Sequence, residues 1–459
     1  MTLRIIRILT IVFSIAILAT SGSRADDPIV LGYYMAWSKS SFQHTAVPYD
    51  QVTHIAHAFV WPRANGTLDT YSYFFYPELV QRARDEGKKM ILSIGGWGNS
   101  DGFGPMAADE VSRAGFVDGI TTFCLENGYD GIDLDWEYPG SADRQNFVKL
   151  VQELRESFSE QEPPLSISIA LPSSDWRNGY DIPALRDLVD YFGVMTYDFH
   201  GSWTSHSGHN SPLYPPPSHV CQDGSLHQSV NYFLQRGVPA TKLVVGGASY
   251  GRRFNTADLY QPPTSPTNNG VAVSYADAMK LIDQGWAYHW DDISKVPYLK
   301  NPGGTQIVSF DDTVSFRYKA EYIKANDLRG VKVWALGYDY TGNGHPLMET
   351  LATHLLSVTE IRNSQQEDTP DNFRLLQNYP NPFNNRTMIT YVVDTYNAEV
   401  KLRVFDILGR KVTTLVDQRL DTGRHTIEFS PGYSIPSGVY MYRLDVDGHT
   451  SVKFMSYLK

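Results

Sequence analysis

Short apolar runs rich in β-branched residues recur over the first three quarters of the chain, and amphipathic stretches lie between most of them. In the stretch 142–158, Phe147, Leu150, Val151 and Leu154 fall on one helical stripe. Near-continuous apolar strands that alternate with helices indicate a parallel sheet with both faces covered. The expected strands begin at Ile29, His54, Lys89, Gly131, Leu165, Tyr191, Lys242 and Gly330.

Eight such repeats fit a closed barrel better than an open sheet. We therefore predict an α/β fold, a (β/α)8 TIM barrel, over residues 26–357. The connection between Gly251 and Gly330 is long for a single strand-to-helix link. A small insertion within 252–329 is therefore expected.

The pattern changes after Ser357. Residues 358–371 are polar and predict a linker. Over residues 372–459, apolar and polar positions alternate with period two between Gly, Pro and Asn turns, as in "TMITYVV" and "GVYMYRLDV". This alternation predicts a small all-β, Ig-like sandwich as a second domain.

Residues 1–25 have the pattern of a signal peptide. Arg4 and Arg7 precede the apolar segment 8–19, and Ser23 and Ala25 are small residues just before the expected cleavage point. An uncleaved membrane anchor is the alternative. The 459 residues carry a formal net charge of −11, which argues against nucleic acid as a partner because phosphate backbones need a basic face.

Cysteine usage excludes a disulfide framework, because this exported chain has only Cys124 and Cys221. Cys124 lies beside Ile120 on an expected helix and is predicted to be a buried small hydrophobe, with a Cys124–Cys221 bridge as the alternative. No Cys and His cluster has zinc-ligand spacing, so we expect no metal and no cofactor. His200 and His206 are expected to be structural loop residues.

Three acids occupy alternate positions in the segment "DGIDLDWEYPG". Asp133, Asp135 and Glu137 would share one strand face, and the apolar residues between them the other. If helices cover the apolar face, the acids point into the barrel with Glu137 nearest the mouth, where barrel enzymes place their chemistry. Mutual repulsion and poor solvation of such crowded carboxylates raise at least one pKa, which produces a general acid. An acidic strand on a solvated sheet edge and calcium ligation are the alternatives.

Other expected strands end in aromatic and polar residues that would gather at the same mouth. Tyr197 and Asp198 end one strand, and Tyr250 and Arg252 follow another. Acids ringed by flat aromatic side chains suit a sugar polymer, because aromatic faces stack on pyranose rings. Taken singly, each aromatic residue could equally serve packing. The other expected substrate-binding residues are Tyr33, Phe59, Gly96, Trp97, Trp203 and Trp334, with Trp37 near the same rim.

Four motifs resemble those of family 18 glycoside hydrolases. Residues 130–137, "DGIDLDWE", have the form DxxDxDxE, and the following "YP" is typical of the chitinases in that family. "SIGG", "MTYD" and "GVKVWALGYD" resemble three further strands of the family, in the same order along the chain. The resemblance covers roughly residues 28–357. It implies a chitinase that hydrolyses β-1,4 bonds between N-acetylglucosamine units.

The resemblance also implies a retaining, substrate-assisted mechanism. Glu137 would protonate the leaving oxygen while the substrate's own acetamido carbonyl attacks the anomeric carbon and gives an oxazolinium ion. Asp135 would hold the acetamido N–H, Asp133 would share a proton with Asp135, and Tyr197 would bond the acetamido oxygen. The residues that would contact the sugar itself are Asp198, Arg252 and Trp334.

Residues 372–459 resemble the C-terminal sorting domains of type IX secretion cargo, on the motifs "LLQNYPNPFNNRT", "VFDILGRKVTTLV" and "SGVYMYRL". This resemblance implies a secreted protein whose second partner is the secretion machinery. Attachment to the cell surface and removal of the tail stay open. A sugar-binding or spacer sandwich is the alternative.

Three rival functions remain at this point. A non-catalytic chitin-binding lectin on the same barrel typically lacks the acid at the Glu137 position. An endo-β-N-acetylglucosaminidase acting on N-glycans shares the mechanism, although "WEYP" and the aromatic rim favour chitin. A surface adhesin would act through the sandwich. We expect a monomer whose substrates are chitin or N-acetylglucosamine oligosaccharides.

Overall fold

The computed structural model describes residues 28–217, 223–342 and 344–356, and, with short gaps, residues 373–457. The chain divides into two compact units, Met1–Thr359 and Glu360–Lys459, and each unit has its own buried apolar cluster. The expected signal peptide and the expected linker lie outside the described residues. The domain boundaries therefore stay predictions.

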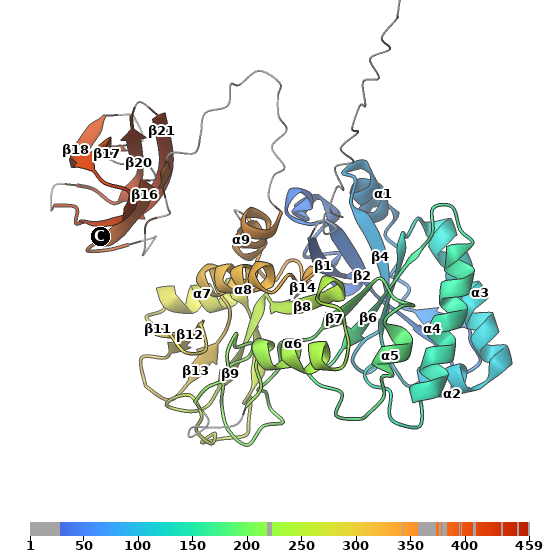
Figure 1. Ribbon diagram of the computed structural model, residues 1–459. Helices are drawn as coiled ribbons and strands as arrows, with labels where there is room; N and C mark the ends of the chain where they lie inside the picture. Colours follow the sequence, from blue (N-terminus) through green and yellow to red (C-terminus); the bar gives the residue numbers. More distant parts are fainter. Residues whose placement is uncertain are drawn as a thin grey trace, which may run out of the picture. The chain divides into compact units, whose positions relative to one another are not determined.

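Eight parallel strands close into a barrel in the first unit (Figure 1). Their order around the ring is β1-β2-β4-β5-β6-β7-β8-β14, and β1 pairs with both β2 and β14. The predicted (β/α)8 barrel is thus confirmed. The strands are β1 Ile29–Met35, β2 His54–Pro62, β4 Lys89–Gly95, β5 Gly131–Asp135, β6 Ser166–Leu171, β7 Tyr191–Val194, β8 Leu243–Ala248 and β14 Gly330–Trp334, with β3 Leu68–Thr70 added antiparallel to β2.

Helices cover the outside of the barrel. Ile132 and Leu134 of β5 join one large core cluster with Phe147 and Leu150 of α4, which is the stripe that the sequence pattern predicts. The residues that point inward form a separate, smaller cluster that includes Leu31. The helices are α1 Pro77–Asp85, α2 Phe103–Ala108, α3 Glu110–Asn127, α4 Arg144–Ser159, α5 Ile182–Leu185, α6 Leu226–Gln235, α8 Thr313–Ala325 and α9 Pro346–Leu355.

A second, antiparallel sheet lies between β8 and β14 in sequence, with strand order β10-β9-β13-β12-β11. The sequence predicts one strand for the run from Lys242 through Gly251, and this prediction is wrong. Ser249 divides the run, because its N–H donates to the Trp334 carbonyl and its hydroxyl to the Ala335 carbonyl. The elements are β9 Tyr250–Phe254, β10 Val271–Ser274, α7 Tyr275–Asp283, β11 Ala287–Asp291, β12 Val296–Lys300 and β13 Ile307–Ser309.

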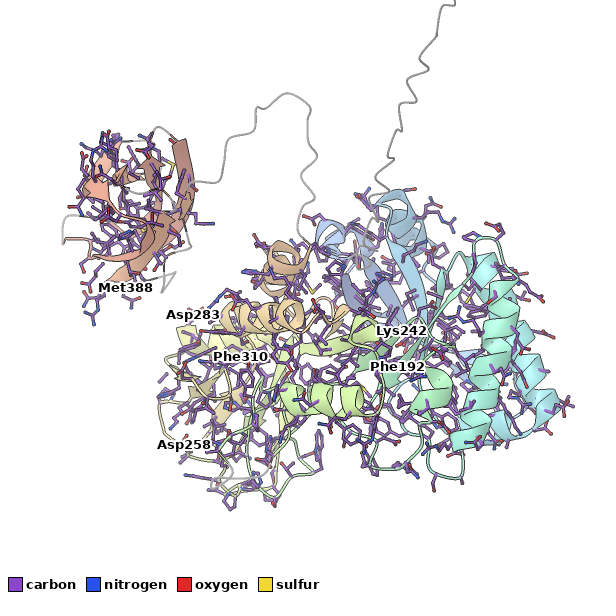
Figure 2. All side chains as sticks on the ribbon, viewed as in Figure 1. Phe192, Lys242, Asp258, Asp283, Phe310 and Met388 are labelled. Carbon is purple, nitrogen blue, oxygen red and sulfur yellow. The ribbon has the colours of Figure 1, made fainter. Side chains whose placement is uncertain are left out.

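Side chains fill the space between the barrel and its helices (Figure 2). Phe192 of β7 and Phe310, just after β13, are both buried there. Cys124 is also buried, as predicted, and burial raises the pKa of its thiol. Cys221 lies outside the described residues, so the alternative of a Cys124–Cys221 bridge stays untested.

The second unit contains two antiparallel sheets, with orders β15-β16-β19 and β18-β17-β20-β21. Both sheets contribute to one buried cluster, which includes Ile389 of β16 and Leu444 of β20. The sheets therefore pack as the predicted sandwich. The strands are β15 Phe373–Leu375, β16 Thr387–Val393, β17 Ala398–Asp406, β18 Lys411–Leu420, β19 Gly423–Phe429, β20 Gly438–Val446 and β21 His449–Tyr457.

Within the described part of the chain, every helix is too short or too polar to cross a membrane.

Candidate active site

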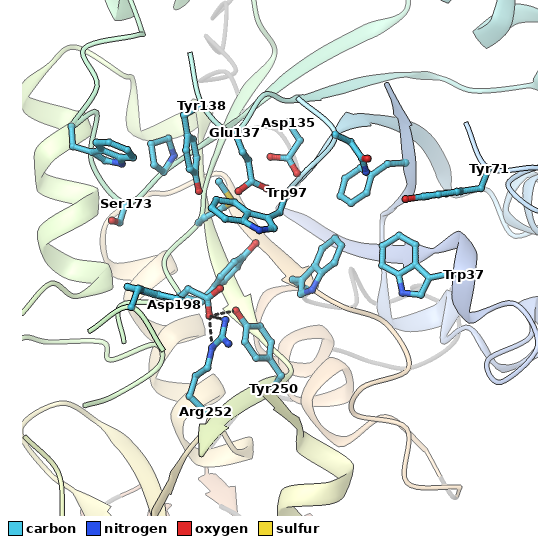
Figure 3. A pocket seen from close by; sticks show the side chains of 18 of the residues that line it. Trp37, Tyr71, Trp97, Asp135, Glu137, Tyr138, Ser173, Asp198, Tyr250 and Arg252 are labelled. Atoms are coloured by element: carbon cyan, nitrogen blue, oxygen red, sulfur yellow. Dashed lines mark hydrogen bonds and ion pairs between the residues drawn. The ribbon is translucent and has the colours of Figure 1, made fainter. Parts of the chain in front are cut away.

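A cavity of about 900 Å3 opens at the carboxyl ends of the barrel strands (Figure 3). Its lining includes Asp135 at the end of β5, Tyr197 just after β7 and Trp334 at the end of β14. Residues far apart in sequence meet here because parallel strands deliver their carboxyl ends to one rim.

The three acids of the β5 segment lie at increasing height inside the barrel. Asp133 is buried below the cavity, Asp135 is 5% exposed and lines it, and Glu137 is half-buried at the rim. Their apolar neighbours Ile132 and Leu134 face the helices. Alternation along the strand therefore points the acids inward, as the sequence indicates.

Hydroxyl groups from three other strands hold Asp133. Tyr33 donates to Asp133 Oδ2 at 2.7 Å, Ser168 donates to Oδ1 at 2.7 Å, and Ser93 donates to Oδ2 at 3.3 Å. Three donors suit an ionised carboxylate, which only accepts. In this arrangement no hydrogen bond joins Asp133 to Asp135 among the described residues.

Burial is the main cause that raises the pKa values of Asp135 and Glu137. The charges of Glu137 and Asp133 raise the pKa of Asp135 further, while among charges it is that of Asp198 that raises the pKa of Glu137. Of the two causes that the sequence suggests, poor solvation thus outweighs the mutual repulsion of the acids. Asp135 Oδ1 is buried without a hydrogen bond, which favours a proton there or a donor supplied by a ligand.

Lys332 of β14 is a buried cation that the sequence analysis missed. Its Nζ lies 3.4 Å from the Tyr33 hydroxyl, and its charge lowers the pKa values of Asp135 and Glu137. Gly193 of β7 leaves room for it, because a Cβ there would lie 2.7 Å from Lys332 Cδ. The sequence does contain a signal for this lysine. Lys332 stands two residues before Trp334 in an apolar strand, so both side chains are expected on the face that points into the barrel.

A charged cluster closes one side of the cavity and joins the barrel to the second sheet. Asp198 Oδ1 accepts from the Tyr250 hydroxyl at 2.6 Å and from Arg252 Nη2 at 2.7 Å (Figure 3). The Arg252 guanidinium also lies 4.9 Å from the centre of the Trp203 ring. Because Tyr250 and Arg252 belong to β9, the second sheet fixes the position of Asp198.

Aromatic side chains form the floor and the rim. Trp334 packs against Phe59, with ring centres 5.6 Å apart and planes at 14°, and against Tyr33 at 5.3 Å. At the rim, Trp97 is 80% exposed and Trp176 is 68% exposed. Large aromatic rings left in water around a cavity mark a ligand surface, and flat rings suit sugars.

Residues 29–339 match the family model described as Glycosyl hydrolases family 18. The chain belongs to family 18. A "Probable endochitinase" of Caenorhabditis elegans is 34% identical, covering 67% of this chain and 56% of that protein. An "Oviduct-specific glycoprotein" of Mus musculus is 33% identical, covering 75% and 50%. This chain thus spans about half the length of these two curated relatives.

Solved structures of family 18 enzymes have the same fold. A group IV chitinase of Ostrinia furnacalis in complex with allosamidin is 29% identical, with a TM-score of 0.65, covering 72% of this chain and 99% of that one. Residues 377–456 match the family model described as Secretion system C-terminal sorting domain. The tail is therefore a sorting domain, and the protein is secreted.

The family 18 barrel gathers most of the expected residues around one cavity. Tyr33 and Gly96 do not line it: Tyr33 lies beneath Trp334, and a Cβ on Gly96 would lie 2.6 Å from the Phe59 ring. Both positions support the cavity wall, and their expected contact with substrate stays a prediction. The expected residues that do line the cavity are Phe59, Trp97, Asp135, Glu137, Tyr197, Asp198, Trp203, Tyr250, Arg252 and Trp334.

Four aromatic lining residues escaped the sequence analysis because they lie in loops without periodicity. Tyr138 follows Glu137 directly, and its side-chain hydrogen bond lowers the pKa of Glu137. Trp176 follows β6, while Tyr71 and Tyr73 follow β3. Only Tyr138, in the quoted "WEYP", had a sequence signal.

Proposed function

We propose that this family 18 barrel is a chitinase, which hydrolyses β-1,4 bonds between N-acetylglucosamine units with retention of configuration. The observation that carries the proposal is the pair formed by Glu137, a rim acid with a raised pKa, and Asp135, a buried acid with an unpartnered oxygen. The chitinases among the relatives support the substrate class.

Glu137 starts the reaction as the general acid. Its carboxyl O–H gives the proton to the glycosidic oxygen as the bond from that oxygen to the anomeric carbon breaks. The acetamido carbonyl oxygen of the same sugar forms a bond to the anomeric carbon on the opposite face. The leaving sugar departs as a neutral alcohol, and the positive charge stays on the oxazolinium ring.

Asp135 stabilises that ring. Its buried oxygen accepts the acetamido N–H, and its negative charge offsets the developing cation in a site from which water is largely excluded. The Tyr197 hydroxyl, which makes no hydrogen bond within the described chain, donates to the acetamido oxygen and aims it. Asp133 lies deeper in the barrel, and its negative charge raises the pKa of Asp135.

Water completes the cycle. The Glu137 carboxylate takes a proton from a water molecule, whose oxygen attacks the anomeric carbon and opens the oxazolinium ring. Two displacements on opposite faces retain the β configuration. Trp334 is the floor for the sugar at the cleavage point, and Asp198 and Arg252 contact its hydroxyls at the rim.

The test uses N-acetylglucosamine oligomers with the parent protein and Glu137→Gln. We expect the first product anomer of the parent, read by proton NMR, to be β. Glu137→Gln should bind the oligomer with similar affinity in calorimetry but turn it over about 10²–10⁴ times more slowly. Parent-like turnover by Glu137→Gln would refute the assignment of the acid.

The same preparation separates the rival functions. Binding without turnover by the parent protein would indicate a lectin, and cleavage of N-glycans in preference to the oligomers would indicate an endo-β-N-acetylglucosaminidase. We also propose that the protein acts as a monomer, since the cavity is built from one chain. Light scattering of the purified chain tests this.

A further inference from the structure

Two histidines and an aspartate converge in the loops that follow β7, outside the cavity. His200 Nε2 lies 2.7 Å from Asp223 Oδ2, and His206 Nε2 lies 3.6 Å from Asp223 Oδ1. The nearest nitrogen and oxygen atoms of the three side chains all lie within 4.8 Å of one another. The sequence shows no such cluster because Asp223 follows His206 only much later in the same connection between β7 and α6.

The other ring nitrogen of each histidine fixes the tautomer. His200 Nδ1 lies 2.8 Å from the His209 carbonyl oxygen, and His206 Nδ1 lies 2.9 Å from the Ser207 carbonyl oxygen. A carbonyl can only accept, so Nδ1 carries the hydrogen in both rings. In the neutral form, each Nε2 therefore directs a lone pair toward the Asp223 carboxylate.

This contact is unfavourable without something between the groups. His200 is 2% exposed, and neither its Nε2 nor Asp223 Oδ2 makes a hydrogen bond, although both atoms are buried. Two nitrogen lone pairs and a carboxylate that face one point instead form a ligand set for a cation.

We propose that His200, His206 and Asp223 bind a divalent transition-metal ion, with zinc as the best fit. Zinc takes imidazole and carboxylate ligands at about 2.0–2.2 Å, so tetrahedral ligand atoms lie roughly 3.4 Å apart. The His206–Asp223 separation of 3.6 Å is close to that spacing, and the His200–Asp223 separation of 2.7 Å is shorter, so an ion would move these two side chains slightly apart. Water would supply the fourth ligand, because the His206 and Asp223 side chains are 28% and 20% exposed.

The surrounding chain holds the ligands in place before any ion arrives. Gly208 packs against the His200 ring, since a Cβ there would lie 2.3 Å from His200 Cε1. Gly224 packs against Phe199 in the same way, at 2.7 Å. Nδ1–H bonds from metal-binding histidines to backbone carbonyls are the usual outer support of such a site.

The proposed ion would stabilise one wall of the cavity. His200 follows Asp198 by two residues, and Trp203 lies between His200 and His206 in the same loop. Asp198 and Trp203 both line the cavity. An ion at this position would therefore fix the loop that carries two substrate-facing residues, without taking part in the chemistry. The inference does not depend on the proposed substrate.

The test uses the full chain, stripped of metal with a chelator and titrated with Zn2+. We expect calorimetry and elemental analysis to give one zinc per chain, with a rise in melting temperature. Co2+ should give the visible absorption bands of a tetrahedral site. His206→Ala and Asp223→Asn should each weaken zinc binding at least about tenfold and remove most of the thermal shift.

Asp291→Asn is the matched control. It removes the carboxylate of another His–Asp contact, in which His209 Nε2 lies 3.0 Å from Asp291 and Nδ1 lies 3.0 Å from Ser309 Oγ, so both ring nitrogens already have partners. This variant should bind zinc like the parent. Absence of zinc binding by the parent, or parent-like binding by both ligand variants, would overturn the proposal.

Discussion

Lys332 acts against burial at the two cavity acids. Burial raises the pKa values of Asp135 and Glu137, and the lysine charge lowers both. A general acid works best when its pKa is near the working pH. Burial alone would raise the pKa further, and the lysine charge alone would lower it. The position of one ammonium group within the barrel thereby tunes the proton that Glu137 is proposed to donate.

Lys332→Met should move the alkaline limb of the kcat/KM profile to higher pH. Removing a positive charge that lowers the pKa of Glu137 raises that pKa, so the acid stays protonated as the pH increases. The profile is measured with an N-acetylglucosamine oligomer. Lys242→Met is the control, because the Lys242 amino group donates to the Arg186 and Val189 carbonyls. An alkaline limb equal to that of the parent would contradict the prediction.

For single residues, the sequence predicts the site positions that lie on strands better than those that lie in loops. Alternation alone predicts that Asp133 and Asp135 point into the barrel, because neighbouring strand positions must face opposite sides. The position of Asp198 depends on its hydrogen bonds to Tyr250 and Arg252 in the second sheet. The hydrophobic pattern of the sequence does not predict that sheet. The sequence suggests both poor solvation and mutual repulsion as causes of a raised pKa, but which of the two is larger depends on three-dimensional packing.

Helix α8 is tied to its surroundings by a fully buried ion pair. Lys319 Nζ lies 2.6 Å from both carboxylate oxygens of Asp311 and 2.7 Å from the Ser211 carbonyl oxygen. Both side chains are almost inaccessible to water. The pair connects the helix to the segments after β13 and before α6, so it holds the second sheet against the barrel.

Lys319→Met should lower the free energy of unfolding by about 3–5 kcal/mol, because it leaves the Asp311 carboxylate buried without its counter-charge. Urea denaturation followed by tryptophan fluorescence measures this, since all nine tryptophans precede residue 335. Combining Lys319→Met with Asp311→Leu should recover much of the loss. A double variant that is as unstable as the single one would argue that the pair stabilises the native state outright.

At the level of elements, the barrel strands were predictable because they are buried on both faces and read as apolar runs. The run that contains β8 and β9 reads as one strand because its composition does not change at Ser249. There the hydrogen bonds of Ser249 go to the carbonyls of Trp334, the last residue of β14, and Ala335. β18 escaped notice because its side chains are mostly exposed and do not alternate.

The whole molecule consists of two units with separate cores, which have different roles. The first carries the cavity, and the second matches a sorting domain. A chain that ends at residue 356 should therefore keep the turnover and the tryptophan-detected melting transition of the full chain. Turnover that fell with the tail removed would show that the sandwich contributes to substrate binding.

Two histidines of β2, the buried His57 and the partly buried His54, should make the barrel less stable in acid. Burial lowers the pKa of His57 to about 3 and that of His54 to about 4, while both titrate near 6.5 when unfolded. The unfolded state then binds more protons below about pH 6.5, so this stability is complete above that pH and is lost as the pH falls toward 4 and 3. The loss is at most roughly 1.4 kcal/mol per pH unit for each histidine.

The free energy of unfolding, measured by tryptophan fluorescence between about pH 7 and about pH 4, should fall less steeply for His57→Asn than for the parent. His354→Asn, at a partly exposed position on α9, should keep the parental slope. Equal slopes for His57→Asn and the parent would mean that His57 takes up its proton in the folded state.

A substitution at Gly193 would change the position of the Lys332 side chain. A methyl group there would press on the aliphatic stem of Lys332 from a strand two places away around the ring. The electric field at the reacting bond is thus governed partly by an uncharged position that touches no substrate. An engineer who wishes to shift the working acidity of the molecule could leave every ionisable group as it is and exchange one hydrogen atom for a carbon.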